Sequence, residues 1–260
     1  MLFSFPVLFF TLLYYGFIAG IVYFFISRRR LVRKIRQDRL RGLAKRMQLE
    51  FLEEDRFGLK SQLNQFDLFR HERRWFFFNN TKITNVLYKK VGETDVYLFD
   101  YTYLKSYGKT TKRVTQTVFF ANNRHWDLPD FKLKPETWWH KVKQTLGIDH
   151  DINFPDGPEF SDKVWLKGQF EDMVRNKFSP ELRKFILEHP PAHVEGNNFY
   201  LISYKPGQKL EADEAEKFFD NQLQLMQLME HEGKLELLSL AELKEKSADP
   251  IPLEKDLNEI

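Results

Sequence analysis

The sequence predicts an α+β protein in which an antiparallel sheet is packed by helices and preceded by one N-terminal transmembrane helix. Residues 1–27 contain no charged side chain and are followed at once by three arginines. Between Trp75 and Phe120, apolar residues alternate with polar ones, which is the period of β-strands. Several other segments repeat apolar residues at spacings of three and four, which is the period of helices.

The first segment, residues 1–27, is predicted to be a permanent transmembrane anchor. From Phe5 to Ile26 a helix spans roughly 30 Å, the thickness of the hydrocarbon core of a bilayer. A cleaved signal peptide carries positive charge before a shorter apolar core, whereas here the charge follows the core. Between residues 28 and 46 the chain carries ten Lys or Arg against one acid. Because positive flanks stay inside, the N-terminus is expected outside and residues 28–260 in the cytoplasm.

Gly16 and Gly20 form a small-xxx-small pattern within this anchor. Such a pattern lets two membrane helices approach closely, so the two glycines are the candidate contact face of a homodimer. The alternative is that both glycines are simply tolerated in a helix that faces lipid. Replacement of both by Leu separates the alternatives, because unchanged association in a membrane dimer assay would exclude this contact face.

Residues 28–48 are predicted to continue the anchor as a basic juxtamembrane helix, with apolar residues at Val32, Ile35, Leu43 and Met47. Near an anionic leaflet each Lys or Arg contributes up to about 1 kcal/mol to membrane binding. The side chains expected to contact anionic headgroups are Arg28, Arg29, Arg30, Arg33, Lys34 and Arg36. The alternative is a solvated linker that obeys only the positive-inside rule.

The body, residues 49–231, is expected to be one cytosolic domain, followed by an acidic, mobile tail over 232–260. Residues 28–46 carry a net charge of +9, so the total of +3 leaves −6 for residues 47–260. An acidic body disfavours nucleic acid as a partner, because a nucleic-acid-binding domain presents a basic face. The chain has no cysteine, which excludes disulfides, thiolate metal sites and a cysteine nucleophile.

The first half of the body is predicted to be a short helix followed by strands. The helix, over 59–69, has apolar residues at spacings of four and three. The strands, over 83–88, 95–104 and 113–121, are rich in β-branched and aromatic residues. A turn at Ser106–Lys109, which contains a glycine, makes the last two strands an antiparallel hairpin.

One face of the strand over 95–104 presents four aromatic side chains, Tyr97, Phe99, Tyr101 and Tyr103. We expect these rings to pack beneath a helix. The alternative, a platform on which nucleobases stack, is disfavoured because the basic-glycine-aromatic signature of such sheets is missing. Asp100 lies on the opposite face of the same strand, where it is expected at the surface.

The second half of the body mixes short helices and strands. Its predicted elements are a helix over 136–146, a strand over 160–166, helices over 170–176 and 179–189, a hairpin of strands over 192–195 and 198–204, and a helix over 212–230. Ser179 is the expected N-cap of its helix and Pro180 the first residue. Gly196 and Asn197 are expected at the turn of the hairpin. The last helix is expected to close the core with its apolar side.

The best cluster of potential metal ligands is His140 with Asp149, His150 and Asp151, since imidazole and carboxylate groups bind divalent metals. Their spacing matches no known ligand pattern, and a polar loop after a helix is the alternative explanation. No catalytic residue and no cofactor is assigned. The sequence contains no phosphate-binding loop and no dinucleotide-binding, serine-hydrolase or zinc-protease motif.

The chain contains, in this order, the sequence segments EEDRFGLKSQLNQFDLF, VYLFDYTY, KRVTQTVFF, LPDFKLKPE, INFPDGPEFS, WLKG, VRNKFSPELRKF and HVEGNNFYLISYKPG. This order resembles a family of uncharacterised bacterial single-pass membrane proteins with one N-terminal helix and a cytosolic domain of this size. The resemblance covers about residues 45–230. It implies a place in the bacterial cytoplasmic membrane, and it implies no site residue because the family has no established activity.

These observations favour a membrane-anchored cytosolic binding or scaffolding module, because no nucleophile, metal or phosphate motif is present. The main alternative is a membrane-tethered enzyme whose site residues converge only in three dimensions. A third hypothesis is lipid sensing by the basic arm. The expected partners are the bilayer with its anionic headgroups and an unidentified protein.

Overall fold

The computed structural model describes residues 5–70, 81–107, 110–135, 151–189 and 192–247 of the chain. Its helices are α1 (Phe5–Met47), α2 (Leu59–Leu63), α3 (Asp67–Arg70), α5 (Pro158–Lys163), α6 (Glu171–Lys177), α7 (Pro180–Glu188) and α8 (Ala212–Ser247). Its strands are β1 (Glu50–Glu54), β2 (Lys82–Val91), β3 (Thr94–Tyr107), β4 (Thr110–Asn122), β5 (Leu128–Pro135), β6 (Val164–Gly168), β7 (His193–Asn198) and β8 (Tyr200–Tyr204).

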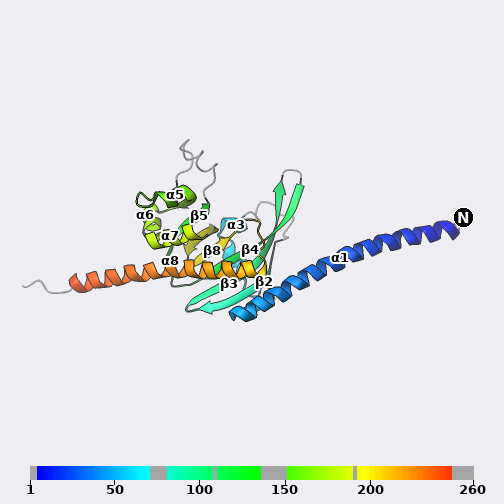
Figure 1. Ribbon diagram of the computed structural model, residues 1–260, viewed down its shortest axis with the longest axis horizontal. Coiled ribbons are helices and arrows are strands. Elements are labelled where there is room, and N and C mark those ends of the chain that lie inside the picture. The colour runs from blue at the N-terminus through cyan, green and yellow to red at the C-terminus, as the bar shows by residue number, and fades with distance from the viewer. Residues whose placement is uncertain (1–4, 71–80, 108–109, 136–150, 190–191, 248–260) are drawn as a thin grey trace, which may run out of the picture.

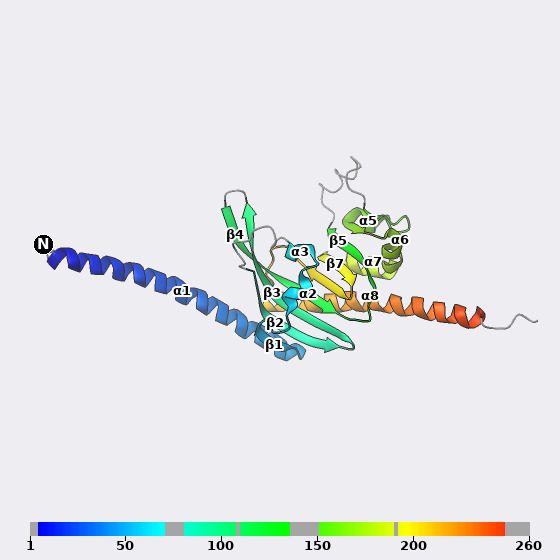
Figure 2. The same cartoon turned by 180° about the vertical axis from the view of Figure 1, so that it is seen from behind.

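These strands form one antiparallel sheet in the order β1-β2-β3-β4-β8-β7-β5-β6. Helices cover both faces of the sheet, with α8 in front of it in Figure 1 and α2 and α3 in front of it in the reverse view of Figure 2. The two long helices α1 and α8 leave the body at opposite ends. The predicted α+β class, with an antiparallel sheet and a long apolar helix at the N-terminus, is confirmed.

The aromatic row of β3 packs on the face that carries α2 and α3. Tyr97, Phe99 and Tyr101 are buried together with Leu63 of α2 and Phe69 of α3. This burial confirms that the rings pack beneath helices. The larger core on the other face joins residues of the sheet to α1, α6, α7 and α8.

Helix α1 runs without interruption through the predicted anchor and the basic arm. Its 43 residues span roughly 65 Å at 1.5 Å per residue. Among the described residues it is the one helix long and apolar enough to cross a membrane. At its C-terminal end Leu40, Leu43 and Ala44 are buried in the larger core, and each buried leucine contributes about 1.5–3 kcal/mol. Ile35, by contrast, is exposed, because the buried face of the helix lies to one side of it.

The hairpin predicted from period-2 alternation is confirmed. Strands β3 and β4 pair continuously from Asp95 opposite Asn122 to Tyr107 opposite Thr110. The hairpin of β7 and β8 also forms, but its turn lies two residues later than expected. Gly196 is inside strand β7, where it pairs with Leu201. A glycine fits this position because a Cβ would overlap the ring of Phe131.

Several helix boundaries differ from the prediction. Two short helices, α2 and α3, replace the single helix over 59–69. The expected strand over 160–166 is instead helix α5 followed by β6, because Pro158 starts a helical turn that buries Phe160. Helix α7 begins as predicted, with the Ser179 side chain accepting a hydrogen bond from the backbone N–H of Leu182 at 3.2 Å. Helix α8 continues to Ser247. The predicted helix over 136–146 lies outside the described residues.

Candidate functional site

A buried ion pair joins the long N-terminal helix α1 to the sheet. Arg36 of α1 donates from Nε and Nη2 to the two carboxylate oxygens of Asp100 on β3, both at 2.7 Å. Its Nη1 donates to the backbone carbonyl of Leu210, just before α8, at 2.9 Å. The Arg36 side chain is 9 % exposed and that of Asp100 4 %. A bidentate pair of this kind fixes both the distance and the orientation of α1 relative to the sheet.

Asp100 is the centre of a larger hydrogen-bond network. Asn85 of β2 donates from Nδ2 at 2.9 Å, and Thr117 of β4 donates from its hydroxyl at 3.3 Å. The Thr117 hydroxyl in turn accepts the backbone N–H of Leu210 at 3.0 Å. The carboxylate therefore connects three adjacent strands with α1 and with the start of α8. The expectation that Asp100 lies at the surface is wrong, because α1 covers this face of the strand.

A β-bulge places Asn85 in this network. Between the pairs Thr84–Asp100 and Leu87–Leu98, β2 contains one residue more than β3. Asn85 adopts φ 54°, the left-handed conformation that asparagine tolerates better than most residues. Its Nδ2 faces Asp100 because a carboxylate only accepts hydrogen bonds, and its Oδ1 is buried without a hydrogen-bond partner among the described residues.

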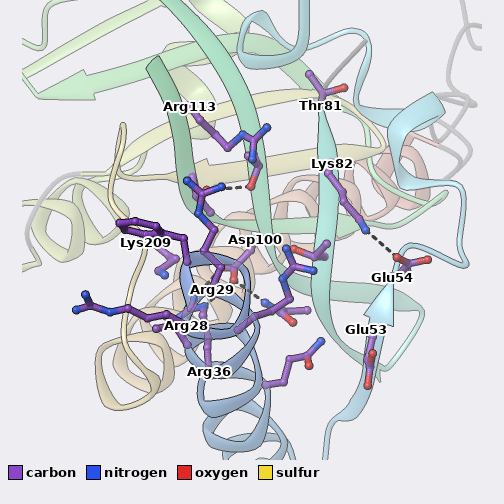
Figure 3. A pocket seen from close by; sticks show the side chains of 18 residues that line it. Arg28, Arg29, Arg36, Glu53, Glu54, Thr81, Lys82, Asp100, Arg113 and Lys209 are labelled. Carbon is purple, nitrogen blue, oxygen red and sulfur yellow. Dashed lines mark hydrogen bonds and ion pairs between the residues drawn. The ribbon is translucent and has the colours of Figure 1, made fainter. Parts of the chain in front are cut away.

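A cavity of about 840 Å³ lies beside this network, between α1 and strands β2, β3 and β4 (Figure 3). Its lining is rich in charge, and Figure 3 shows side chains from α1 and from the sheet approaching the same space. Seven basic residues line it: Arg28, Arg29, Arg33, Arg36, Lys82, Arg113 and Lys209. Three acidic residues line it: Glu53, Glu54 and Asp100.

The three carboxylates of the cavity already have basic partners. Asp100 pairs with Arg36, Glu53 with Arg41, and Glu54 with Lys82 at 2.8 Å. The hydrogen bond from Lys82 lowers the pKa of Glu54 below its ordinary value. The other five basic residues of the lining make no ion pair within the part of the chain that the structure describes: Arg28, Arg29, Arg33, Arg113 and Lys209.

One face of α1 forms the helical wall of the cavity. Residues 25, 28, 29, 32, 33, 36 and 37 line the cavity, and their spacings of three and one place them on a single side of a helix. Farther along, the same side carries the buried Leu40 and Leu43. Toward the membrane segment the wall includes two apolar side chains, Phe25 and Val32, which are more than half exposed. Along the helix, Phe25 precedes Arg28 and Arg29, and Val32 lies between Arg29 and Arg33, so the wall interleaves apolar and basic side chains.

The residues predicted to contact headgroups divide into three groups. Arg28, Arg29 and Arg33 line the cavity, whereas Arg30 and Lys34 are exposed on other sides of α1. Headgroup contact by these five side chains stays a prediction. For Arg36 the prediction is wrong, because its side chain is buried against Asp100 and is unavailable to a membrane surface.

The other predicted site residues stay untested. His140, Asp149 and His150 lie outside the described residues, so metal binding by these three with Asp151 stays a prediction. Within the described ranges, no group of three His, Cys, Asp or Glu side chains is arranged to hold a metal ion. Gly16 and Gly20 have open space around them on α1, and homodimer contact at this face stays a prediction.

A second buried carboxylate, Glu195, lies on the opposite face of the sheet. It accepts a hydrogen bond from the hydroxyl of Tyr204 at 3.1 Å and from the backbone N–H of Asp67 at 3.3 Å. Burial raises the pKa of Glu195 above its ordinary value. Both of its oxygens are used by the fold, so we assign it a structural role.

No family model and no curated protein matches the chain. Among solved structures, it is similar to the mycobacterial trehalose monomycolate transport factor A, TtfA, with a TM-score of 0.44 and 13% sequence identity. The alignment covers 74% of this chain and 94% of that one. A likeness at this score is distant and carries no argument about function. The resemblance to a family of bacterial single-pass membrane proteins therefore stays a prediction.

Proposed function

We propose that the chain is a single-pass membrane protein whose body is a non-catalytic binding module, with its ligand in the cavity between α1 and the sheet. The observation that carries the proposal is the set of five cations around this cavity that form no ion pair with any residue the structure describes. Like charges that share a small volume repel one another, and an anionic ligand would relieve that repulsion. The volume of about 840 Å³ is typical of a site for a small molecule.

The chemistry of the lining supports binding over catalysis. A general base or nucleophile must be free to take a proton or attack a substrate. Each carboxylate of the cavity is instead paired with Arg or Lys. The described lining contains no His, Ser, Cys or Tyr side chain. These features favour a binding module over the alternative of a membrane-tethered enzyme.

We further propose that the body, with this cavity, lies in the cytoplasm at the inner membrane. The cluster of basic residues directly after the apolar run supports this orientation. A reporter fused after Ile260 is then expected to be inaccessible from the outer face of intact cells. Labelling of that reporter from outside would contradict the orientation.

Cysteine protection tests occupancy of the cavity, because the chain has no cysteine of its own. A Thr102→Cys variant places one thiol in the lining, and a Glu93→Cys variant places one in the exposed turn between β2 and β3 as a control. Both are treated with a membrane-impermeant maleimide in inverted membrane vesicles, and again after purification and extensive washing in detergent.

An occupied cavity predicts that the Thr102→Cys variant reacts more slowly in vesicles than after washing. The Glu93→Cys variant is expected to react at the same rate in both conditions. Equal rates for the Thr102→Cys variant, with and without the native membrane, would contradict a bound ligand.

A further inference from the structure

We infer that the ligand of this cavity is the phosphate-bearing headgroup of an anionic membrane lipid, an inference that rests on the binding function proposed above. Three features point to this class of ligand: the kind of cation, the number of elements that supply the cations, and the apolar side chains of the cavity wall.

The cations of the cavity suit a phosphate group. Four of the five unpaired cations are arginines, and the fifth is Lys209. A guanidinium presents forked N–H donors that match two oxygens of one phosphate, while an ammonium adds a compact charge. Arginine is therefore the residue expected where a phosphate ester is held by several groups at once.

These cations converge from separate parts of the fold. Arg28, Arg29 and Arg33 belong to α1, Arg113 belongs to β4, and Lys209 precedes α8. Figure 3 shows Arg28, Arg29, Arg113 and Lys209 around the cavity. The buried pair of Arg36 and Asp100 holds α1 against the sheet. The cations of α1 and the two cations outside it therefore line the same cavity. A general attraction to an anionic leaflet needs only an exposed basic helix. A site built from three elements instead has the geometry to bind one headgroup.

The apolar side chains of the wall favour a lipid over a water-soluble phosphate. Phe25 is 54% exposed and Val32 56%, and both line the same cavity as the arginines. Phe25 belongs to the uncharged run that is long enough to span a bilayer. A lipid in the adjacent leaflet can keep its acyl chains beside this run while its headgroup enters the cavity. A free phosphate has no group that would contact these two side chains.

The test uses the full-length protein in nanodiscs of phosphatidylcholine with and without phosphatidylglycerol, and measures bound lipid by native mass spectrometry. The cavity variant is Arg113→Gln with Lys209→Gln, both exposed side chains outside α1. The matched control is Arg124→Gln with Lys90→Gln, which removes the same charge from exposed sites outside the cavity. Unchanged thermal midpoints establish that each variant folds.

The wild type and the control are expected to retain one phosphatidylglycerol per chain, and the cavity variant to bind it about tenfold or more weakly, because each lost charge-assisted hydrogen bond weakens binding. A second pair of variants tests the helical wall: Arg29→Gln with Arg33→Gln is expected to lose the lipid, and Arg30→Gln with Lys34→Gln to keep it. Equal lipid retention by cavity and control variants would overturn the proposal.

Competition separates the two sources of phosphate. Inorganic phosphate and glycerol phosphate are expected to displace the lipid poorly, because neither has an acyl chain to contact Phe25 and Val32. Binding of glycerol phosphate as tightly as the lipid would overturn the assignment to a lipid. If the Thr102→Cys variant is protected in vesicles but lipid retention is insensitive to the cavity cations, the binding function stands and this ligand class is wrong. If neither effect occurs, both fail.

Discussion

The ion pair between Arg36 and Asp100 gives the sharpest stability prediction. Asp100→Asn keeps the shape of the side chain but leaves the guanidinium, nine-tenths of whose side chain is buried, without a counter-charge. Arg36→Gln leaves the carboxylate with only the neutral donors of Asn85 and Thr117. Breaking a buried pair from one side costs about 3–5 kcal/mol of unfolding free energy. Each single variant is expected in this range.

The double variant, Arg36→Gln with Asp100→Asn, removes both charges together. What it loses is mainly the strength of a few hydrogen bonds, each worth about 0.5–1.5 kcal/mol net. The single variants together sum to about 6–10 kcal/mol, whereas the loss of two or three hydrogen bonds costs about 1–4 kcal/mol. The two substitutions should therefore be strongly non-additive, with a coupling free energy of about 3 kcal/mol or more. The sign matters as much as the size: the double variant should be much less destabilised than the sum of the singles.

Urea unfolding of the full-length protein in non-ionic detergent measures these free energies. Trp126 and Trp165 are buried in the body and report unfolding by their fluorescence. The control cycle uses Glu159 and Lys163, an exposed pair one helical turn apart, which should show no measurable coupling. Additive effects at Arg36 and Asp100, like those at the control pair, would refute the account of a buried charge pair.

Two further substitutions test packing and titration. Gly196→Ala is expected to destabilise the fold by about 1–3 kcal/mol, because the added Cβ would overlap the ring of Phe131. Gly42→Ala is expected to stabilise the fold by about 0.5–1 kcal/mol, because the added Cβ meets open space on α1. Urea midpoints that shift in the same direction for the two glycine variants would contradict the packing argument. Burial raises the pKa of Glu195, so its contribution to stability is present below the ordinary pKa and is lost as pH rises through the raised one. Glu195→Gln should therefore gain stability relative to the wild type as pH rises from the ordinary glutamate pKa through the raised one, by about 1.4 kcal/mol per unit of pKa difference. A difference in thermal midpoint that is constant with pH would contradict this.

Local periodicity explains which elements the sequence predicts. The richness of 95–104 and 113–121 in β-branched and aromatic residues identifies the strands of the β3–β4 hairpin, and residues 96–101 and 116–121 are buried on both faces of the sheet. The N-cap at Ser179 is predicted for the same local reason, since its hydrogen bond reaches only three residues along the chain. The uncharged run before Arg28 identifies the long apolar helix.

Contacts between distant residues explain what the sequence does not predict. Arg36 and Asp100 are 64 positions apart, and each has an ordinary local explanation, as a basic flank and as a surface carboxylate. One signal was present in the sequence: Arg36 lies four residues before Leu40 and seven before Leu43, on what became the buried face of α1. The cations Arg113 and Lys209 gave no such signal, because only the order of the strands brings them to α1.

The most direct test of the central claim is photo-crosslinking from inside the cavity. A photoreactive amino acid replaces Thr115, a half-buried residue of the lining, in the full-length protein in its native membrane. The same amino acid in place of the exposed Phe199, in the turn between β7 and β8, is the control. The account predicts a phospholipid adduct at position 115, identified by mass spectrometry, and none at position 199. Equal yields at both positions, or no adduct at position 115, would contradict a ligand site between the membrane helix and the sheet.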